Sequence, residues 1–158
     1  MCTEIIEFTD KNETAVCNLA SIALPKYVIV PTGNVRGKDK KLRKYDFQKL
    51  YDVTYQATVN LNQVIDINYY PVPQTKLSNV KHRPIGLGIQ GLADALALLR
   101  IPFDSDEAVE FNAKVMETIY LAAVTASNDI AKYRYNDMNK LIEYFANGVD
   151  KPDSKFYS

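Results

Sequence analysis

Residues 81–91 read KHRPIGLGIQG, and the choice of fold class depends on how this stretch is interpreted. Residues 86–91 match the pattern G-x-G-x-x-G, which is typical of dinucleotide-binding folds. In dinucleotide-binding folds that pattern directly follows a buried strand, since its glycines form the tight turn where the pyrophosphate meets backbone N–H groups. Here a polar loop ending at Pro84 precedes the glycines, and no βαβ unit is recognisable around them. We therefore expect no dinucleotide site and predict a helix over residues 85–100. His82 is expected to be a surface or capping residue rather than a catalytic one.

The segment before this stretch has the apolar spacing of one long helix. Asp46 is its predicted N-cap, and Tyr70-Pro71 ends the pattern. Residues 71–79 are expected to form a loop that leads to the glycine stretch. The predicted buried face of the helix consists of Leu50, Val53, Ala57, Leu61 and Val64.

The segment after the glycine stretch predicts a third helix. Asp104 and Glu107 have the spacing of a capping box, with Asp in place of the usual Ser or Thr. The pattern allows residues 133–145 to prolong this helix until Gly148, with Pro152 beyond it as a breaker. Its predicted apolar face consists of Ala108, Phe111, Val115, Ile119, Ala122 and Ile130.

The N-terminal part of the chain predicts short strands rather than helices. Residues 3–8 and 27–30 are rich in β-branched and aromatic types, and turn residues or Pro31 follow them. The segment between them and Asp46 is basic, and a solvated surface loop is the favoured interpretation over a patch for phosphate or an acidic partner. Its basic residues are Arg36, Lys38, Lys40, Lys41, Arg43 and Lys44.

Composition and charge set limits on the function. The 158 residues are 47% apolar and 24% charged, as in one ordinary globular domain, and 19 basic residues balance 19 acidic ones, which gives no reason to expect a nucleic-acid partner. The sequence contains no signal-like leader and no apolar run of membrane-spanning length, so we expect a cytoplasmic protein without a membrane partner. Two cysteines and one histidine cannot form a usual four-ligand zinc site, so cysteine chemistry must come from individual thiols.

Cys2 and Glu4 are the first candidate site residues. In a strand, side chains two positions apart project from the same face, with Cα atoms roughly 6–7 Å apart. A thiol and a carboxylate placed in this way can flank one small substrate. The pair alone is weak evidence, because Cys and Glu at this spacing occur by chance in many strands.

The surrounding sequence makes the pair more specific. Long motifs, in the right order, closely resemble those of the large subunit of class I ribonucleotide reductases. The resemblance extends from Cys2 to about Lys132, and the basic segment 31–43 looks like an insertion relative to many members. The motifs are CTEIIE at 2–7, ETAVCNLAS at 13–21, NLN at 60–62, IDINYYPV at 65–72 and HRPIGLGIQGLAD at 82–94.

The resemblance implies a fold as well as a function. The family has a ten-stranded α/β barrel, of which this chain carries a part, so we expect a mainly α-helical partial domain with one or two short strands. The glycine stretch is then part of a helix that packs on the barrel. The expected regions are a radical-loop strand and basic insertion at 1–44, barrel helices at 45–132 and a divergent tail at 133–158. Without its neighbouring strands, the N-terminal segment is expected to be irregular, edge-paired or associated with another copy.

The resemblance also implies roles for individual residues. Cys2 matches the cysteine that becomes a thiyl radical and abstracts the 3′ hydrogen of a ribonucleoside diphosphate. Glu4 matches the carboxylate that takes the 3′-hydroxyl proton, a general-base role. Cys17 matches one member of the redox pair that reduces the 2′ position and becomes a disulfide. Its partner lies upstream in the family, so a disulfide between Cys2 and Cys17 is not implied.

Cofactors and partners are expected to lie outside this chain. By the resemblance, a metal or radical cofactor belongs to a small radical-generating subunit, and ATP and deoxynucleotide effectors bind in regions with no counterpart in this sequence. The expected partners are the substrate, the remainder of the large subunit and the small subunit. The chain is therefore expected to act only when completed. The alternative is a catalytically silent helical fragment or paralogue that serves as an interaction module.

Overall fold

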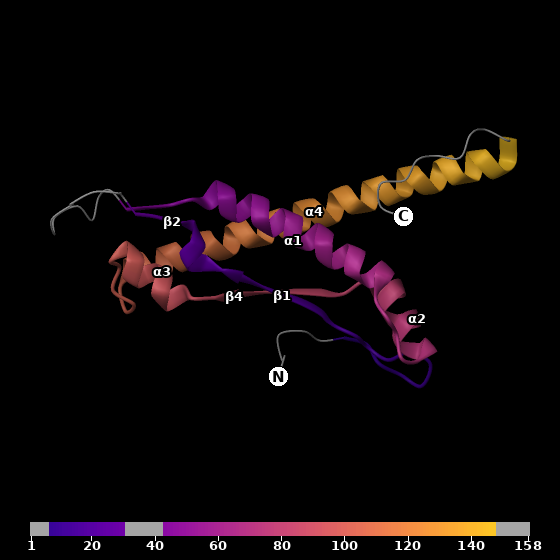
Figure 1. The fold of residues 1–158 in the computed structure, drawn as a ribbon, viewed down its shortest axis with the longest axis horizontal. Helices are drawn as coiled ribbons and strands as arrows, with labels where there is room; N and C mark the ends of the chain where they lie inside the picture. The colour runs from indigo at the N-terminus through magenta and orange to yellow at the C-terminus, as the bar shows by residue number, and fades with distance from the viewer. Residues whose placement is uncertain (1–6, 31–42, 148–158) are drawn as a thin grey trace.

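A computed structural model describes residues 7–30 and 43–147 of the chain (Figure 1). Most of these residues are helical, as predicted, but they also form more strands than the one or two expected. The elements in chain order are β1 (Asn18–Ala23), the 3-10 helix η1 (Leu24–Tyr27), β2 (Val28–Ile29), β3 (Lys44–Tyr45), α1 (Phe47–Ile67), α2 (Pro73–His82), β4 (Ile85–Gln90), α3 (Leu92–Leu99) and α4 (Asp106–Asn147).

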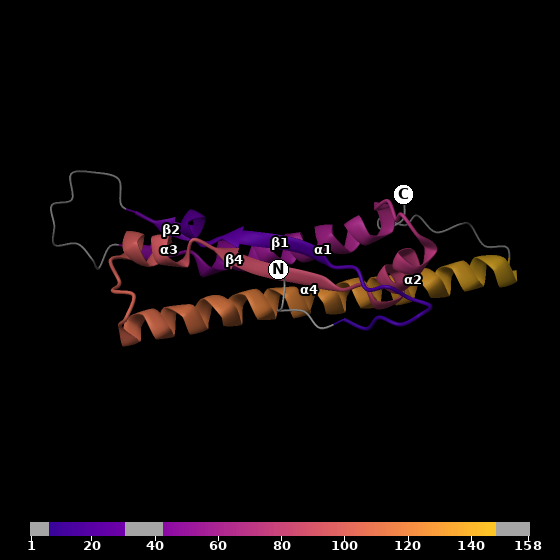
Figure 2. The ribbon, with the colours of Figure 1, turned by 90° about the horizontal axis from the view of Figure 1, so that it is seen from below.

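The core lies where two long helices meet a parallel pair of strands. Helix α4 runs along nearly the whole length of the molecule, α1 packs against it, and β1 and β4 lie beside these helices (Figures 1 and 2). The central cluster takes side chains from β1, η1, α1, α3 and α4. Its buried members are Ile22, Leu24, Tyr27, Leu50, Ala95, Leu96, Leu99, Ala108, Phe111, Val115 and Ile119.

The glycine stretch is a strand followed by a helix, so the helix predicted over 85–100 is wrong in its first part. Strand β4 pairs in parallel with β1, with Asn18 opposite Ile85 and Ala23 opposite Gln90. Glycine is a poor helix former, which disfavours a helix over residues 85–90. As a strand, this segment needs a partner for its backbone hydrogen bonds, and β1 is that partner. The chain crosses from β1 to β4 through α1 and α2, so a connection between parallel strands exists that the sequence did not reveal.

This arrangement changes the reason for expecting no dinucleotide site. Gly86 and Gly88 lie inside β4, and only Gly91 stands at the junction between the strand and α3. The fingerprint needs all its glycines in the strand-to-helix turn and at the start of the helix. Two of the three glycines therefore lie outside the strand-to-helix turn, although the absence of nucleotide binding stays a prediction.

Helix α2 occupies most of the segment that was predicted to be a loop. It begins at Pro73, and proline is favourable in the first helical turn because its missing N–H has no partner there in any case. It ends at His82, because Arg83 adopts a left-handed conformation with φ 49°. The helix is polar, with apolar Leu77 and Val80 exposed, so apolar periodicity gave no signal for it.

Helix α1 confirms the helix predicted between the N-cap Asp46 and Tyr70-Pro71, but only part of its predicted face is turned inward, since Leu50 and Leu61 are buried. Asp46 caps it by accepting a hydrogen bond from the Lys49 N–H at 2.9 Å. Val53 and Val64 of the predicted face are exposed. The buried polar side chains include Thr54 and Thr58, whose hydroxyls donate to carbonyls one turn earlier, so these two polar residues can line the buried face with their hydroxyls satisfied. The buried residues are Leu50, Thr54, Thr58, Leu61, Asn62 and Ile65.

Helix α4 confirms the third predicted helix and its apolar face. All six predicted positions are buried, and the helix continues through the first part of the predicted tail to Asn147. The predicted cap Asp104 is wrong by one residue. The Ser105 hydroxyl accepts the hydrogen bond from the Ala108 N–H at 3.2 Å, the role that a capping side chain has at a helix start.

Strands β2 and β3 form a short antiparallel pair beside the aromatic part of the core. Val28 lies opposite Tyr45, which confirms a strand within 27–30. Rings of Tyr27, Phe47 and Phe111 surround Tyr45 with centroids 4.8–6.1 Å away, and burial raises the pKa of Tyr45 well above its usual range. Most of the basic segment lies outside the described residues.

The remaining predictions concern the N-terminal strand, the basic segment and membrane-spanning helices. Residues 3–6 of the predicted N-terminal strand lie outside the described residues, and Glu7 and Phe8 are not in a strand. The guanidinium of Arg43, at the end of the basic segment, donates to the Leu98 carbonyl in α3. No helix within residues 7–30 and 43–147 is long and apolar enough to cross a membrane.

Gly91 is the glycine that the fold requires. Its φ is +75°, and a Cβ at this position would lie 2.8 Å from the ring of Pro25. We expect Gly91→Ala to lower the free energy of unfolding by about 2 kcal/mol or more, through left-handed strain and overpacking. Urea unfolding measures the change. Gly88→Ala is the matched control, because its Cβ would meet Ser21 at an ordinary 3.6 Å; equal losses for both variants would refute the explanation.

Candidate functional site

Cys17 is the predicted site residue that the structure places. It is partly buried and lies directly before β1, at the end of the parallel pair where β4 also begins. Cys2 and Glu4 lie outside the described residues, so the structure does not test whether they approach Cys17. The surroundings of Cys17 are nevertheless well defined.

A buried chain of polar groups fixes the residue next to Cys17. The Asn18 amide donates to the Asn79 oxygen at 2.8 Å and to the Pro84 carbonyl at 2.9 Å. The Asn79 amide in turn donates to the Tyr70 hydroxyl, which donates to a carbonyl near the end of α1. Because Asn18 and Asn79 are buried, loss of either partner would leave polar groups unsatisfied, at a cost of about 1–3 kcal/mol. The network therefore holds the start of β1 in one position.

A second contact ties the segment before Cys17 to the end of α2. The carboxylate of Glu13 is almost fully buried and accepts from Lys81 at 3.0 Å, with the His82 ring nitrogen 3.2 Å away. Asp10 shapes the turn before it, since its side chain accepts the N–H groups of Asn12 and Glu13, and these bonds lower the pKa of Asp10. His82 is partly exposed and paired, which agrees with a surface position.

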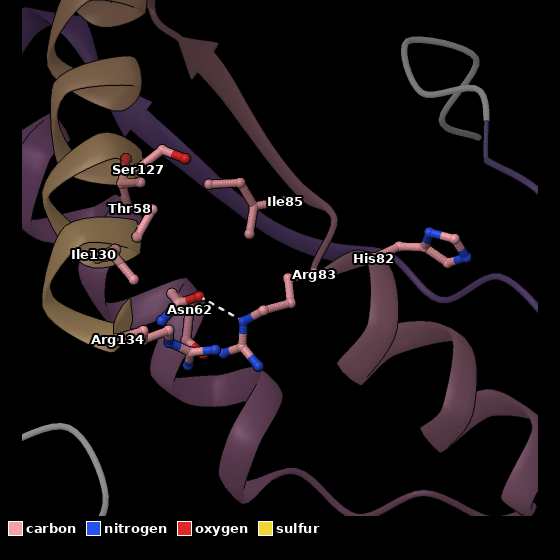
Figure 3. Close-up of a pocket in the computed structure, with 9 residues that line it drawn as sticks. Thr58, Asn62, His82, Arg83, Ile85, Ser127, Ile130 and Arg134 are labelled. Carbon is pink, nitrogen blue, oxygen red and sulfur yellow. Dashed lines mark hydrogen bonds between the residues drawn. The ribbon is translucent and has the colours of Figure 1, made fainter. Parts of the chain in front are cut away.

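Arg83 joins the glycine stretch to α1 and α4. Its guanidinium binds both oxygens of Asp66 at 2.7 and 2.8 Å, and its Nε donates to the Asn62 oxygen at 2.8 Å (Figure 3). Arg134 of α4 also binds Asp66 at 2.7 Å. These side chains are partly exposed, and their charge-assisted bonds are directional, with both oxygens of Asp66 engaged. The start of β4 is thereby fixed from both long helices.

These contacts connect the sequence motifs with one another. Residues 13–21, 60–72 and 82–94 meet at one end of the parallel pair through Glu13, Asn18, Asn62, Asp66, Tyr70, His82 and Arg83. The motif residues that sequence reasoning left without a role therefore position the strand starts. One signal was available, since Asn62 and Asp66 are four apart and share a helix face. Their partner Arg83 was not predictable.

The described part of the chain contains no group of three His, Cys, Asp or Glu residues arranged to hold a metal ion. Around the candidate site, the described residues supply the Cys17 thiol and the hydrogen-bonded side chains of Asn18 and Asn79. We assign no cofactor to these residues.

Comparison with known proteins places the chain in a family. The family model for the ribonucleotide reductase barrel domain matches residues 1–152. The chain therefore belongs to this family, as its motifs indicated. The match passes Lys132 and includes most of the segment at 133–158 for which the motifs gave no counterpart.

The relatives are ribonucleoside-diphosphate reductase large subunits. The chain is 55% identical over 139 residues to the large subunit of Arabidopsis thaliana, which covers 83% of this chain and 17% of the relative. It is 54% identical over 131 residues to that of Dictyostelium discoideum, covering 83% and 15%. It is 48% identical over 149 residues to that of Variola virus, covering 94% and 18%. The chain thus spans less than a fifth of the length of these relatives.

Proposed function

We propose that the chain is part of the catalytic barrel of a ribonucleoside-diphosphate reductase. The reaction converts ribonucleoside diphosphates to deoxyribonucleoside diphosphates. Family membership and about 50% identity to relatives of that name support the proposal. The structural observation that carries it is the position of Cys17, a partly buried thiol held at the start of a parallel strand by a buried polar network.

The proposed chemistry assigns one step to each site residue. Cys2, as a thiyl radical, abstracts the 3′ hydrogen of the substrate ribose, and Glu4 takes the proton of the 3′-hydroxyl. The 2′-hydroxyl then leaves as water. Cys17 and a cysteine from outside this chain supply the two electrons and two protons, and become a disulfide. Finally, the Cys2 thiol gives its hydrogen atom back to the 3′ carbon, which regenerates the thiyl radical on Cys2.

The contribution of the described residues is positioning. Disulfide formation requires the two sulfur atoms to come within bonding distance. Strand β1, which directly follows Cys17, must therefore not shift along β4. The bonds from Asn18 to Asn79 and Pro84 oppose such a shift, and the pairing of β1 with β4 sets the register.

The proposed partners are the remainder of the large subunit and a small radical-generating subunit that holds the metal or radical cofactor. Nucleotide effectors are proposed to bind elsewhere. Exposed apolar side chains support the proposal that another part of the enzyme covers this surface. Leu19 of β1 is 50% exposed, and Tyr120 of α4 is 74% exposed. Apolar surface of this kind commonly marks an interaction site.

The isolated chain is expected to produce no measurable deoxyribonucleotide. It carries Cys2, Glu4 and Cys17, but in this proposal the second redox cysteine and the radical donor lie elsewhere. The assay combines the purified chain with a small subunit, a ribonucleoside diphosphate and a dithiol reductant. In the positive control, a parallel reaction contains the large subunit of a relative in place of the chain. Turnover by the chain and small subunit alone would contradict the proposal that other segments complete the site.

A further inference from the structure

A pocket of about 190 Å³ lies between the end of α2 and the first described residues of the chain. Its lining consists of Glu7, Phe8 and Pro84 together with Ser78 and His82 of α2. The volume exceeds the ~150 Å³ of a cavity that holds a benzene molecule. The proposed reduction assigns no role to any of these five residues.

Glu7 brings to this pocket a carboxylate that lacks a partner. Its Oε1 atom is buried, yet no donor within residues 7–30 and 43–147 forms a hydrogen bond with it. The carboxylate of Glu13, which also approaches His82, differs in this respect because it accepts from Lys81 at 3.0 Å. A buried carboxylate oxygen without a donor or a positive charge beside it costs free energy. The pocket therefore favours a ligand that supplies both.

The rest of the lining suits an organic cation. The Ser78 side chain is almost fully buried, and its hydroxyl oxygen can accept a hydrogen bond from an N–H group. The ring of Phe8 is 59% exposed, and the face of an aromatic ring attracts a cation. A metal ion is disfavoured, because no group of three His, Cys, Asp or Glu residues in the described part of the chain could hold one.

We propose that this pocket binds an ammonium or guanidinium group beside the carboxylate of Glu7. Lys81 does not fill this role, since its Nζ atom is bound to Glu13. The cationic group has two sources, a free amine and a lysine or arginine side chain from a segment outside this chain. Binding in the pocket requires no step of the proposed reduction, so the two proposals can fail separately.

Calorimetric titration of the purified chain with ethylammonium and with ethylguanidinium tests the proposal, with sodium chloride keeping the ionic strength constant. We expect saturable binding of at least one cation, at one site per chain. Glu7→Gln keeps the size of the side chain but removes its charge, and should weaken binding about tenfold or more. Glu110→Gln, on the exposed surface of α4, removes the same charge outside the pocket lining and should bind as the parent does.

A second variant changes the aromatic part of the lining. Phe8→Leu keeps an apolar side chain but removes the ring face, so it should weaken binding about threefold. Circular dichroism confirms that each variant is folded before titration. The proposal is overturned if neither cation saturates the parent chain, or if Glu7→Gln binds as tightly as Glu110→Gln.

A complete large subunit that carries this chain distinguishes the two sources of the cation. The quantity to compare is the binding that is lost on Glu7→Gln. If this binding is also present in the complete subunit, the pocket is open to a free amine. If it is present only in the isolated chain, a side chain from another segment occupies the pocket. Both results support the proposal, since both require the cation site at Glu7.

Discussion

Cys2→Ser is expected to abolish nucleotide reduction in a complete large subunit that carries this chain. A serine O–H bond is much harder to convert to a radical than a cysteine S–H bond, while the two side chains have nearly the same shape. Each factor of ten in rate corresponds to about 1.4 kcal/mol of barrier, so a rise of about 4 kcal/mol in the barrier to hydrogen abstraction lowers the rate roughly a thousandfold. The measurement is deoxyribonucleoside diphosphate formed per large subunit under saturating substrate.

A neighbouring substitution controls for structural damage in this experiment. Thr3→Ser changes the next residue, whose side chain projects from the opposite face if residues 2–4 are a strand, and should leave turnover close to the parent level. Substrate binding should persist in both variants. Turnover of Cys2→Ser near the parent level would remove Cys2 from the radical role, whatever the fate of Glu4 and Cys17.

The helices were predictable wherever local signals sufficed. Helix α1 has a capping Asp46 and apolar spacing, and α4 has an apolar stripe through Phe111 and Val115, so both were predicted close to their ends. Helix α2 was missed because it is polar and short. Pro73 at its first position was a start signal that periodicity alone could not reveal.

The strand β4 was not predictable from local sequence. Its backbone partner is Asn18–Ala23, which lies two helices earlier in the chain, and this pairing overrides any local preference. Short apolar runs do not distinguish a buried strand from a buried helix, and two of the three patterned glycines, Gly86 and Gly88, lie within the strand and not in the turn after it. The same pairing gives the N-terminal segment an edge partner within this chain.

The candidate site was predictable only by resemblance. The motifs identified Cys17. In the structure, neighbouring motif residues such as Asn18 and Arg83 hold the starts of β1 and β4 in place. Arg83, which binds Asp66, has a left-handed backbone, a conformation that sequence rarely indicates for a residue other than glycine. Helix spacing suggested that Asn62 and Asp66 are neighbours, but not that an arginine beyond α2 joins them.

The most direct test of the central proposal is a graft. The part of this chain that matches the Arabidopsis thaliana large subunit, 83% of the chain at 55% identity, replaces the corresponding segment of that subunit. The hybrid contains every group that the isolated chain is proposed to lack. It therefore separates a catalytic segment from a silent helical module, which would fold in the same place without supporting the reaction.

The quantity to measure is deoxyribonucleoside diphosphate formed by the graft with a matching small subunit and dithiol reductant. A catalytic segment predicts product at a rate within about tenfold of the unmodified large subunit, since a tenfold change corresponds to only about 1.4 kcal/mol of barrier. A graft that folds and binds ribonucleoside diphosphate but forms no product would contradict the assignment of this chain to the catalytic barrel of an active reductase.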